Sequence, residues 1–114
     1  MDRLQMLEYI LDSYPYKLVF VDTDYIIRYM NKEAKHHYYD VRGYSDLIGK
    51  SIFDCHTEAS KEKIIAAVER LKNHANEIYL GVSPSNHRFY LNPVRNEKGE
   101  LVGFFERFEM NLQK

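Results

Sequence analysis

Apolar residues near the start of the chain recur at the three- and four-residue spacing of a helix. Within residues 2–13 they include Leu4, Leu7 and Leu11, which fall on one side of such a helix. Pro15 follows, and proline is disfavoured inside a helix because it lacks an amide donor and clashes with the preceding turn. The pattern therefore predicts an amphipathic helix that ends before Pro15.

The apolar stripe of this helix needs a covering surface. One candidate is the sheet of the same domain. The other is the matching helix of a second chain, in which case the three leucines form a dimer contact. The sequence leaves both open. We treat residues 1–14 as an N-terminal amphipathic helix attached to a domain at residues 15–114, and we expect a homodimer.

Two short runs rich in β-branched and aromatic residues, 17–21 and 25–30, flank a polar turn at 22–24. Such runs joined by a short polar turn predict a β-hairpin. Asn31 follows the second run, and its side-chain oxygen can accept a hydrogen bond from an amide of the next turn. A short helix capped by Asn31 is therefore predicted over residues 32–39.

The longest helical pattern covers residues 61–74. Ile64, Val68 and Leu71 recur on one face, and Ser60 before them is a residue type that caps helix N-termini. Because these features agree, we predict a helix that begins after Ser60 and packs its apolar face on the domain core.

Three further strand patterns follow the long helix, at residues 77–82, 87–94 and 101–110. They predict an antiparallel meander. Pro93 cannot donate to a strand ladder, so we expect it at a strand end or a bulge. Five strands with helices between them indicate an α+β domain in which helices cover one face of a five-stranded antiparallel sheet.

Composition restricts the classes of function. The 114 residues suffice for one modest core, and 45% hydrophobic with 29% charged residues indicate a folded domain. A net charge of −1 provides no basic field for direct contact with nucleic acid. No apolar run approaches the roughly 20 residues of a membrane span, and the N-terminus lacks a signal-peptide layout. We expect a cytoplasmic protein.

Four segments, in their order and spacing, resemble the PAS domain, or sensory box. They are residues 19–24 (VFVDTD) leading to 28–31 (RYMN), residues 47–54 (LIGKSIFD), the long helix from Ser60, and residues 92–103 (NPVRNEKGELVG). Tyr25 departs from the family pattern, which usually has glycine there. The resemblance implies a sheet whose inner face and central helices enclose a small cavity, and a role as the input module of a signalling or transcription-regulatory protein.

A finer resemblance lies just before the long helix. Asp54-Cys55-His56 is similar to a signature of a bacterial and archaeal subgroup of these domains, in which cysteine and histidine are followed by proline. Thr57 stands in place of that proline. Cys55 is the only cysteine, so it cannot form an internal disulfide, which agrees with a reducing compartment.

The cavity implied by the resemblance would be lined by apolar or ring-bearing residues on the segments that face the helices. These are Phe20, Ile52, Phe53, His56, Ile64, Phe89, Leu91 and Phe104. A register error of one residue would exchange each strand residue for its neighbour, because strand side chains alternate between the two faces.

Three functions remain open. The first is a sensory domain that binds a small ligand of unknown identity and controls an effector domain or partner protein. The second is a ligand-free interaction or dimerisation module whose interior is filled by its own tyrosines and phenylalanines. The third is a haem-binding gas or redox sensor, with the His56 imidazole as the axial ligand of the iron.

Other chemistries have less support. Ile52 occupies the place of the reactive cysteine of flavin photoreceptors of this fold, and Cys55 is more readily a small buried residue than a chromophore anchor. Cys55, His56 and the pair His36-His37 lack the spacing of a zinc site. No phosphate-binding loop or hydrolase motif is present. We expect no metal and no enzymatic activity in this domain; catalysis would belong to a separate effector.

Overall fold

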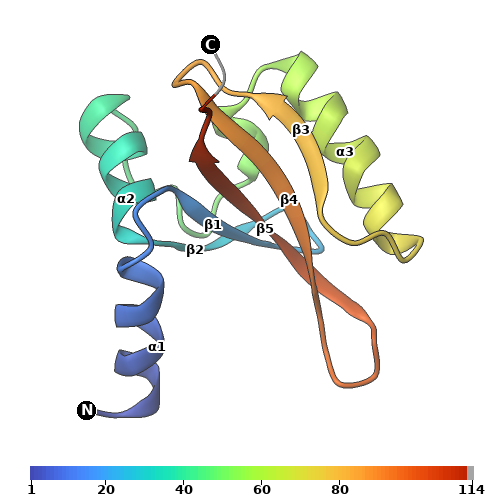
Figure 1. The fold of residues 1–114 in the computed structure, drawn as a ribbon, viewed down its shortest axis with the longest axis horizontal. Coiled ribbons are helices and arrows are strands. Elements are labelled where there is room, and N and C mark those ends of the chain that lie inside the picture. Colours follow the sequence, from blue (N-terminus) through green and yellow to red (C-terminus); the bar gives the residue numbers. More distant parts are fainter. Residues whose placement is uncertain (113–114) are drawn as a thin grey trace.

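An antiparallel sheet forms the platform of the fold. The computed structural model describes residues 1–112, apart from the side chain of Cys55. The five strands lie in the order β2-β1-β5-β4-β3. Their bounds are Leu18–Asp22 (β1), Ile27–Met30 (β2), Ile78–Val82 (β3), His87–Arg95 (β4) and Leu101–Met110 (β5). The predicted α+β class and five-stranded antiparallel sheet are confirmed (Figure 1).

The helical elements are α1 (Arg3–Asp12), α2 (Lys32–Lys35), a π-helical turn η1 (His36–Val41), a 3-10 turn η2 (Ile52–Cys55) and α3 (Glu58–Lys72). α3 contacts β4 and β5, and α2 contacts β1 and β2. In Figure 1, α1 extends away from the sheet, and none of its residues is buried. No helix in the described part of the chain is long and apolar enough to cross a membrane.

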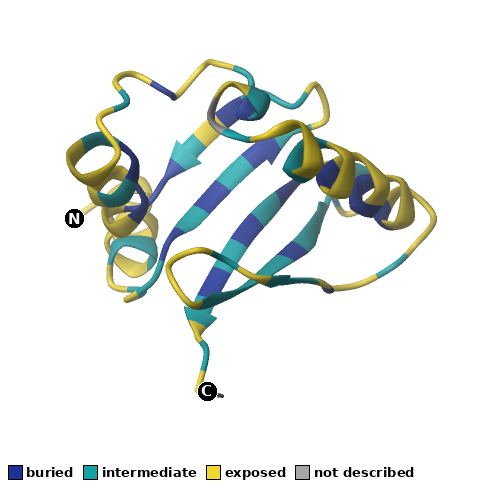
Figure 2. Ribbon diagram, turned by 90° about the horizontal axis from the view of Figure 1, so that it is seen from above, coloured by how far each residue is buried: buried dark blue, intermediate teal, exposed yellow. Residues whose placement is uncertain are grey.

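The core lies between the inner face of the sheet and the helical elements. Buried residues alternate with more exposed ones along the strands and lie along one side of α3 (Figure 2). On β1 the buried side chains are Val19 and Val21, which pair with Glu106 and Phe104 of β5. Because strand side chains alternate, these residues define the inner face. Phe20, between the two valines, lies on the outer face.

The long helix starts one turn earlier than predicted. Thr57, and not Ser60, is its N-cap: the Thr57 hydroxyl oxygen accepts a hydrogen bond from the Ser60 amide at 3.2 Å. Both residue types cap helices well. The earlier start adds a helical turn with Glu58 at the positive end of the helix dipole, which favours it over a start after Ser60.

The short helix after β2 is interrupted by a wider turn. The Asn31 side chain accepts a hydrogen bond from the Ala34 amide at 3.0 Å, so the predicted cap is confirmed. The α-helix covers only Lys32–Lys35, and the chain continues as the π-helical turn His36–Val41. Such turns are uncommon and occur often at functional sites.

The turn between β1 and β2 contains a residue in the left-handed backbone conformation, although that residue is not glycine. Tyr25 has a φ of 63°, a conformation that costs energy for a bulky side chain. The Asp22 carboxylate stabilises the turn by accepting hydrogen bonds from the Asp24 amide at 2.9 Å and the Ile26 amide at 3.1 Å. The Tyr25 ring packs 4.9 Å from the Phe53 ring, centre to centre, so contacts with the core offset the strain.

Pro93 lies inside β4, paired with Phe104 of β5. The pairing between β3 and β4 ends at Ile78 and Leu91, so Pro93 has a strand neighbour on only one side. This position tolerates the missing donor. The expected irregularity occurs one residue later, where the register shifts between Val94 and Arg95.

Candidate ligand pocket

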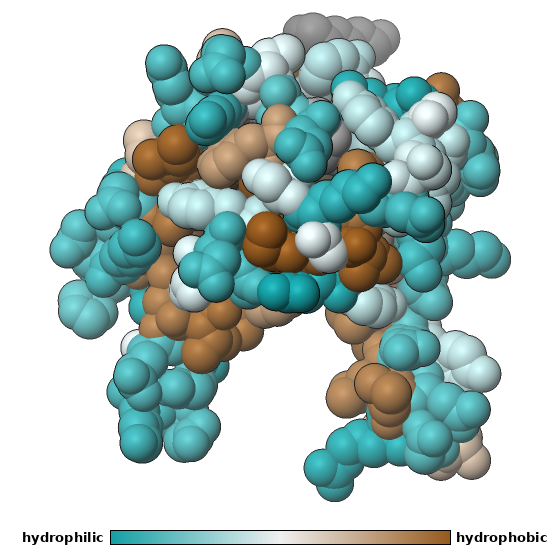
Figure 3. Space-filling view, turned by 180° about the vertical axis from the view of Figure 1, so that it is seen from behind, coloured by the Kyte–Doolittle hydropathy of each residue, from teal (hydrophilic) through white to brown (hydrophobic). Residues whose placement is uncertain are grey.

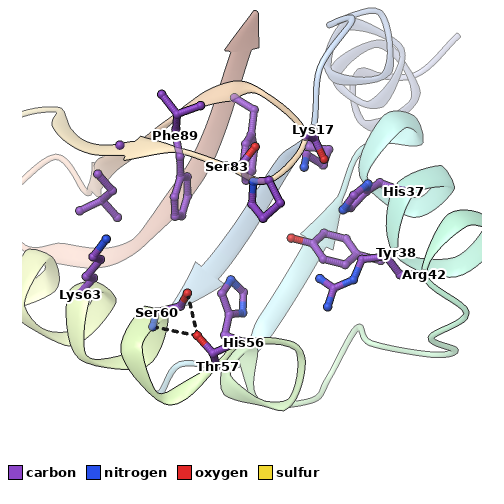
Figure 4. Close-up of a pocket in the computed structure, with 16 residues that line it drawn as sticks. Lys17, His37, Tyr38, Arg42, His56, Thr57, Ser60, Lys63, Ser83 and Phe89 are labelled. Atoms are coloured by element: carbon purple, nitrogen blue, oxygen red, sulfur yellow. Dashed lines mark hydrogen bonds between the residues drawn. The ribbon is translucent and has the colours of Figure 1, made fainter. Parts of the chain in front are cut away.

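A pocket of about 450 Å³ opens between the start of α3, the β3–β4 hairpin and η1 (Figure 4). Gly81 lines it at a bulge in β3, where the register shifts against β4. Its φ of 114° is strained for any residue with a side chain, so the bulge favours glycine. The pocket therefore lies beside the outer hairpin of the sheet, away from the centre of the core.

Two of the predicted cavity residues line this pocket: His56, at the end of η2, and Phe89 of β4. Ile64, Leu91 and Phe104 are fully buried in the core and do not line it.

Two more of the predicted residues lie in neighbouring packed regions. Ile52 lies in the core beside Val19 and Tyr38, where the packing leaves no room for a ligand. Phe53 is half-buried against Tyr25. Most of the predicted lining is therefore core, and the pocket is displaced toward the hairpin.

The prediction for Phe20 was wrong. Phe20 pairs with Phe105 of β5 and Tyr29 of β2 and lies on the outer face of the sheet. Residues 18–21 of β1 are all apolar, so no alternation of polar and apolar residues marks which face is buried. The inward residues are its neighbours Val19 and Val21.

Sequence reasoning missed the polar part of the pocket. Lys17, His37, Tyr38 and Arg42 lie together on one side of it, and Lys63 lies near the start of α3 (Figure 4). One signal was available for Lys17, because it has the same strand parity as the buried Val19 and Val21. The other residues come together only when η1 folds over the end of β1, and no local pattern reports that contact.

Lys17 is a buried cation. It is 6% exposed, and its Nζ lies 4.1 Å from the centre of the Phe108 ring. Burial lowers the pKa of Lys17 to about 8; the Glu106 carboxylate opposes this effect, and the Arg42 charge adds to it. The ammonium form is therefore poorly solvated, and a nearby negative charge would stabilise it.

Glu106 lies beneath the pocket, next to His56, which lines it. Glu106 is 1% exposed on the inner face of β5, and its Oε2 lies 3.7 Å from His56 Nε2. His56 Nδ1 lies 2.8 Å from the Ile52 carbonyl oxygen, which can only accept, so the proton of this contact is on Nδ1. Neither Glu106 oxygen accepts a hydrogen bond from the described residues. The carboxylate is thus available as a counter-charge for Lys17 and for protonated His56.

The electrostatic potential on the side of Lys17 and Arg42 is positive. The pKa of His37 is lowered to about 4 by burial and by the charges of Lys17 and Arg42. The pKa of His87 is lowered by burial and by Lys17. Both shifts mean that an additional positive charge is unfavourable here, so at neutral pH His37 is a neutral hydrogen-bonding group.

Haem ligation by His56 does not fit these contacts. An axial ligand presents a ring nitrogen to the iron. The Nδ1 hydrogen bond to the Ile52 carbonyl is compatible with ligation through Nε2. However, Nε2 lies 3.7 Å from the buried Glu106 carboxylate, which iron at Nε2 would have to displace. Within the described part of the chain, no group of three or more His, Cys, Asp or Glu side chains is arranged to hold a metal ion.

The comparisons with known proteins agree with this architecture. The sequence matches the family described as PAS domain over residues 7–109. No curated protein sequence matches it significantly.

Three solved structures share the fold. A C-terminal domain from Streptococcus mutans has 20% identity and a TM-score of 0.74, over 94% of this chain and 84% of that one. VqmA bound to DPO has 18% identity and a TM-score of 0.65, over 92% and 56%. A sensory box sensor histidine kinase from Vibrio cholerae has 16% identity and a TM-score of 0.64, over 96% and 93%.

At these identities the structural likeness shows the fold, whereas the family match spans most of the chain. The antiparallel sheet, the order of its strands and the helical segments between β2 and β3 agree with that match. The chain belongs to the PAS domain family.

Proposed function

We propose that this PAS domain is the sensory module of a signal-transduction or transcription-regulatory protein and that it binds a small molecule beside His56 and Phe89. The observation that carries the proposal is the pocket itself. It has a volume of about 450 Å³ and combines apolar walls with several convergent polar side chains, which is typical of small-molecule sites. VqmA bound to DPO and the sensor histidine kinase support a sensory role on the same fold.

A hydrogen-bond junction connects the pocket with α1. The Asn31 side chain accepts from the Leu18 amide at 3.0 Å and donates to the Tyr16 carbonyl at 2.9 Å, so it holds both neighbours of the pocket residue Lys17. It also donates to the Leu11 carbonyl in α1 at 3.2 Å. A ligand that moves the backbone at Lys17 would act on bonds that orient α1. The ligand would shift the equilibrium between two arrangements of the domain that differ in the orientation of α1, to the extent that it binds one of them more tightly than the other.

The proposal also covers where the protein acts and which other domain or protein it controls. We place catalytic output in an effector domain or partner protein, and the protein in the cytoplasm without direct nucleic-acid contact. The Asp54-Cys55-His56 run supports a place in the subgroup with that signature. Thr57, where that subgroup has proline, caps α3 through its side chain.

Blocking the pocket tests the proposal. Leu80 lies in β3 and lines the pocket, so Leu80→Trp is expected to fill it with a ring. In an NMR screen of small organic acids, amides and heterocycles, we expect at least one compound to shift the amide resonances of Gly81 and Ser83 in the wild-type protein. Leu80→Trp should weaken that compound at least about tenfold, because the ring and the ligand would occupy the same space.

Ile65→Trp is the matched control, because Ile65 is exposed on α3 and does not line the pocket. Ser83→Phe, on the hairpin turn, blocks the pocket from a second side if Leu80→Trp folds poorly. A compound that binds the blocked variants as well as the wild type would show that its site is elsewhere. Absence of any binding compound would favour the ligand-free module.

The exposed apolar face of α1 supports dimerisation as a second function. Leu4 is 65% exposed and Leu7 is 47% exposed, although both are large apolar residues. Leu11 is half-buried where α1 joins the domain. Since the domain's own sheet does not cover this stripe, we propose that the α1 helix of a second copy covers it.

Sedimentation of the double variant Leu4→Glu/Leu7→Glu tests the dimer. Charges on the stripe should convert the wild-type dimer to a monomer, because a buried interface cannot accept unpaired carboxylates. Neither substitution alters the contacts that α1 makes through the Leu11 carbonyl and Asp12. A wild-type chain that sediments as a monomer, or a variant that remains dimeric, would contradict the proposal.

A further inference from the structure

The lining of the pocket carries positive charge without a lining carboxylate. Lys17, Arg42 and Lys63 line it, and no aspartate or glutamate does. Within the described residues, no carboxylate lies within the 4.0 Å salt-bridge distance of any of these three cations. A ligand that enters the pocket therefore meets cations whose charge is not neutralised by a direct partner.

The cations are not spread evenly. Lys17 and Arg42 lie on the same side of the pocket, together with His37 and the Tyr38 hydroxyl, while Lys63 lies on the other side near α3 (Figure 4). Lys17 is buried, whereas Arg42 is exposed at the rim. Burial, together with the charges of Lys17 and Arg42, lowers the pKa of the neighbouring His37 to about 4, so its imidazole adds no charge here at neutral pH. This side of the pocket thus resembles a binding site for an anionic group.

The lining next to Lys17 is aromatic and apolar, because Phe108, whose ring centre lies 4.1 Å from the Lys17 Nζ, continues into Phe89. The rings of Phe89 and Phe108 stack with their centres 4.8 Å apart and an angle of 5° between their planes. Leu80, Val82 and Pro84 of the β3–β4 hairpin extend the apolar lining. Aromatic rings arranged in this way offer a surface on which a planar ligand can stack.

We propose that the ligand of this pocket is a small organic acid with a planar apolar body, bound with its anionic group between Lys17 and Arg42 and its body against Phe89. This inference rests on the proposed function, which requires only that some small molecule binds. It adds the chemical class and the orientation of that molecule. The Tyr38 hydroxyl and the neutral His37 imidazole are the additional polar groups beside the anionic end.

Charge linkage follows from this geometry. An anion beside Lys17 stabilises its ammonium form and raises its pKa from about 8. Binding therefore takes up protons near pH 8, and the affinity falls as the pH rises above that value. The same anion raises the low pKa of His37. The other charged or titratable groups around the site are Glu106 beneath the pocket, His56 and Lys63 in its lining, and Arg42 and His87 near Lys17.

The test uses indole-3-acetate and its neutral amide, indole-3-acetamide, as probes of matched shape. Titrations of the 15N-labelled full chain at pH 7 should show at least about tenfold tighter binding of the acid, because a charge-assisted contact replaces a neutral one. Lys17→Met should remove this preference, whereas Lys35→Met, on the exposed side of α2 and outside the pocket, should keep it. Arg42→Met should reduce the preference. The His37 ring resonances should titrate at higher pH in the acid complex.

Three outcomes would overturn parts of the account. Equal binding of acid and amide, or binding of neutral compounds alone, would refute the anionic ligand while the proposed pocket stands. An acid preference that survives both Lys17→Met and Arg42→Met would refute the orientation. If neither probe and no compound of the wider screen affects the pocket resonances, the proposed function fails with the inference.

Discussion

Asn31→Ala is expected to lower the free energy of unfolding by about 4 kcal/mol, because Asn31 is fully buried and its side chain makes four hydrogen bonds. Its oxygen accepts from the amides of Leu18 and Ala34, and its nitrogen donates to the carbonyls of Leu11 and Tyr16. Alanine leaves all four backbone groups without this partner. Urea denaturation of the two proteins measures the loss.

Asn73→Ala provides the comparison. Asn73 is exposed at the end of α3, and its side chain donates one hydrogen bond, to the Glu69 carbonyl at 3.0 Å. Its loss should cost less than about 1 kcal/mol. Asn31→Asp should cost at least as much as Asn31→Ala, because it places a buried carboxylate oxygen against the Leu11 and Tyr16 carbonyl oxygens. A loss at Asn31 no larger than that at Asn73 would show that the junction between α1 and the sheet is not held as described.

Phe104→Ala is expected to cost about 4 kcal/mol, since it removes a large ring from the middle of the core. Phe104 is 1% exposed on the central strand β5, and its ring centre lies 6.2 Å from that of Tyr25. The next residue, Phe105, lies on the outer face and is half-buried. Phe105→Ala should therefore cost no more than about 2 kcal/mol. Equal losses at the two positions, measured by chemical denaturation, would contradict the assignment of the two faces.

The outer face of the sheet differs from the inner face in chemistry. Arg107 lies there and binds Glu77 through two nitrogens at 3.0 and 3.1 Å, and its guanidinium stacks 4.2 Å from the centre of the Tyr90 ring. In the view from behind, α1 and the β4–β5 turn project from the body of the molecule, and apolar residues are exposed on α1 (Figure 3). Phe20 is half-buried on the outer face and pairs with Tyr29 and Phe105 of the neighbouring strands, so β1 carries apolar residues on both faces.

The sequence predicts the fold well because the fold depends on local patterns. Runs of β-branched and aromatic residues, or the alternation of apolar and polar residues, identify every strand. Asn31 predicts the helix that follows it, because asparagine is a good N-cap. Errors occur where two residues carry the same signal. Thr57 and Ser60 are both good caps, and the chain uses the earlier one, which adds a helical turn with Glu58 at the positive end of the dipole. Val19, Phe20 and Val21 are all apolar, and only pairing with β5 shows which of them face the core.

The pocket was harder to predict than the fold because distant segments form it. His56 and Phe89 were identified through ring chemistry and the family resemblance, and both line the pocket. Lys17 and Arg42 are ordinary surface residue types in sequence, and Arg42 is brought to Lys17 by the π-helical turn after α2. The sequence therefore predicts that a site exists near His56, but not that one side of it is cationic.

The most direct test of the ligand pocket is the position of a bound molecule. Intermolecular NOEs between the ring protons of indole-3-acetate and the protein locate the probe without relying on any substitution. If the probe binds in the pocket, NOEs are expected with the rings of Phe89 and His56 and with the methyl groups of Leu80. NOEs to Phe20 or Phe105 on the outer face instead would contradict binding in the pocket. The absence of NOEs to the pocket residues at a saturating probe concentration would contradict it as well.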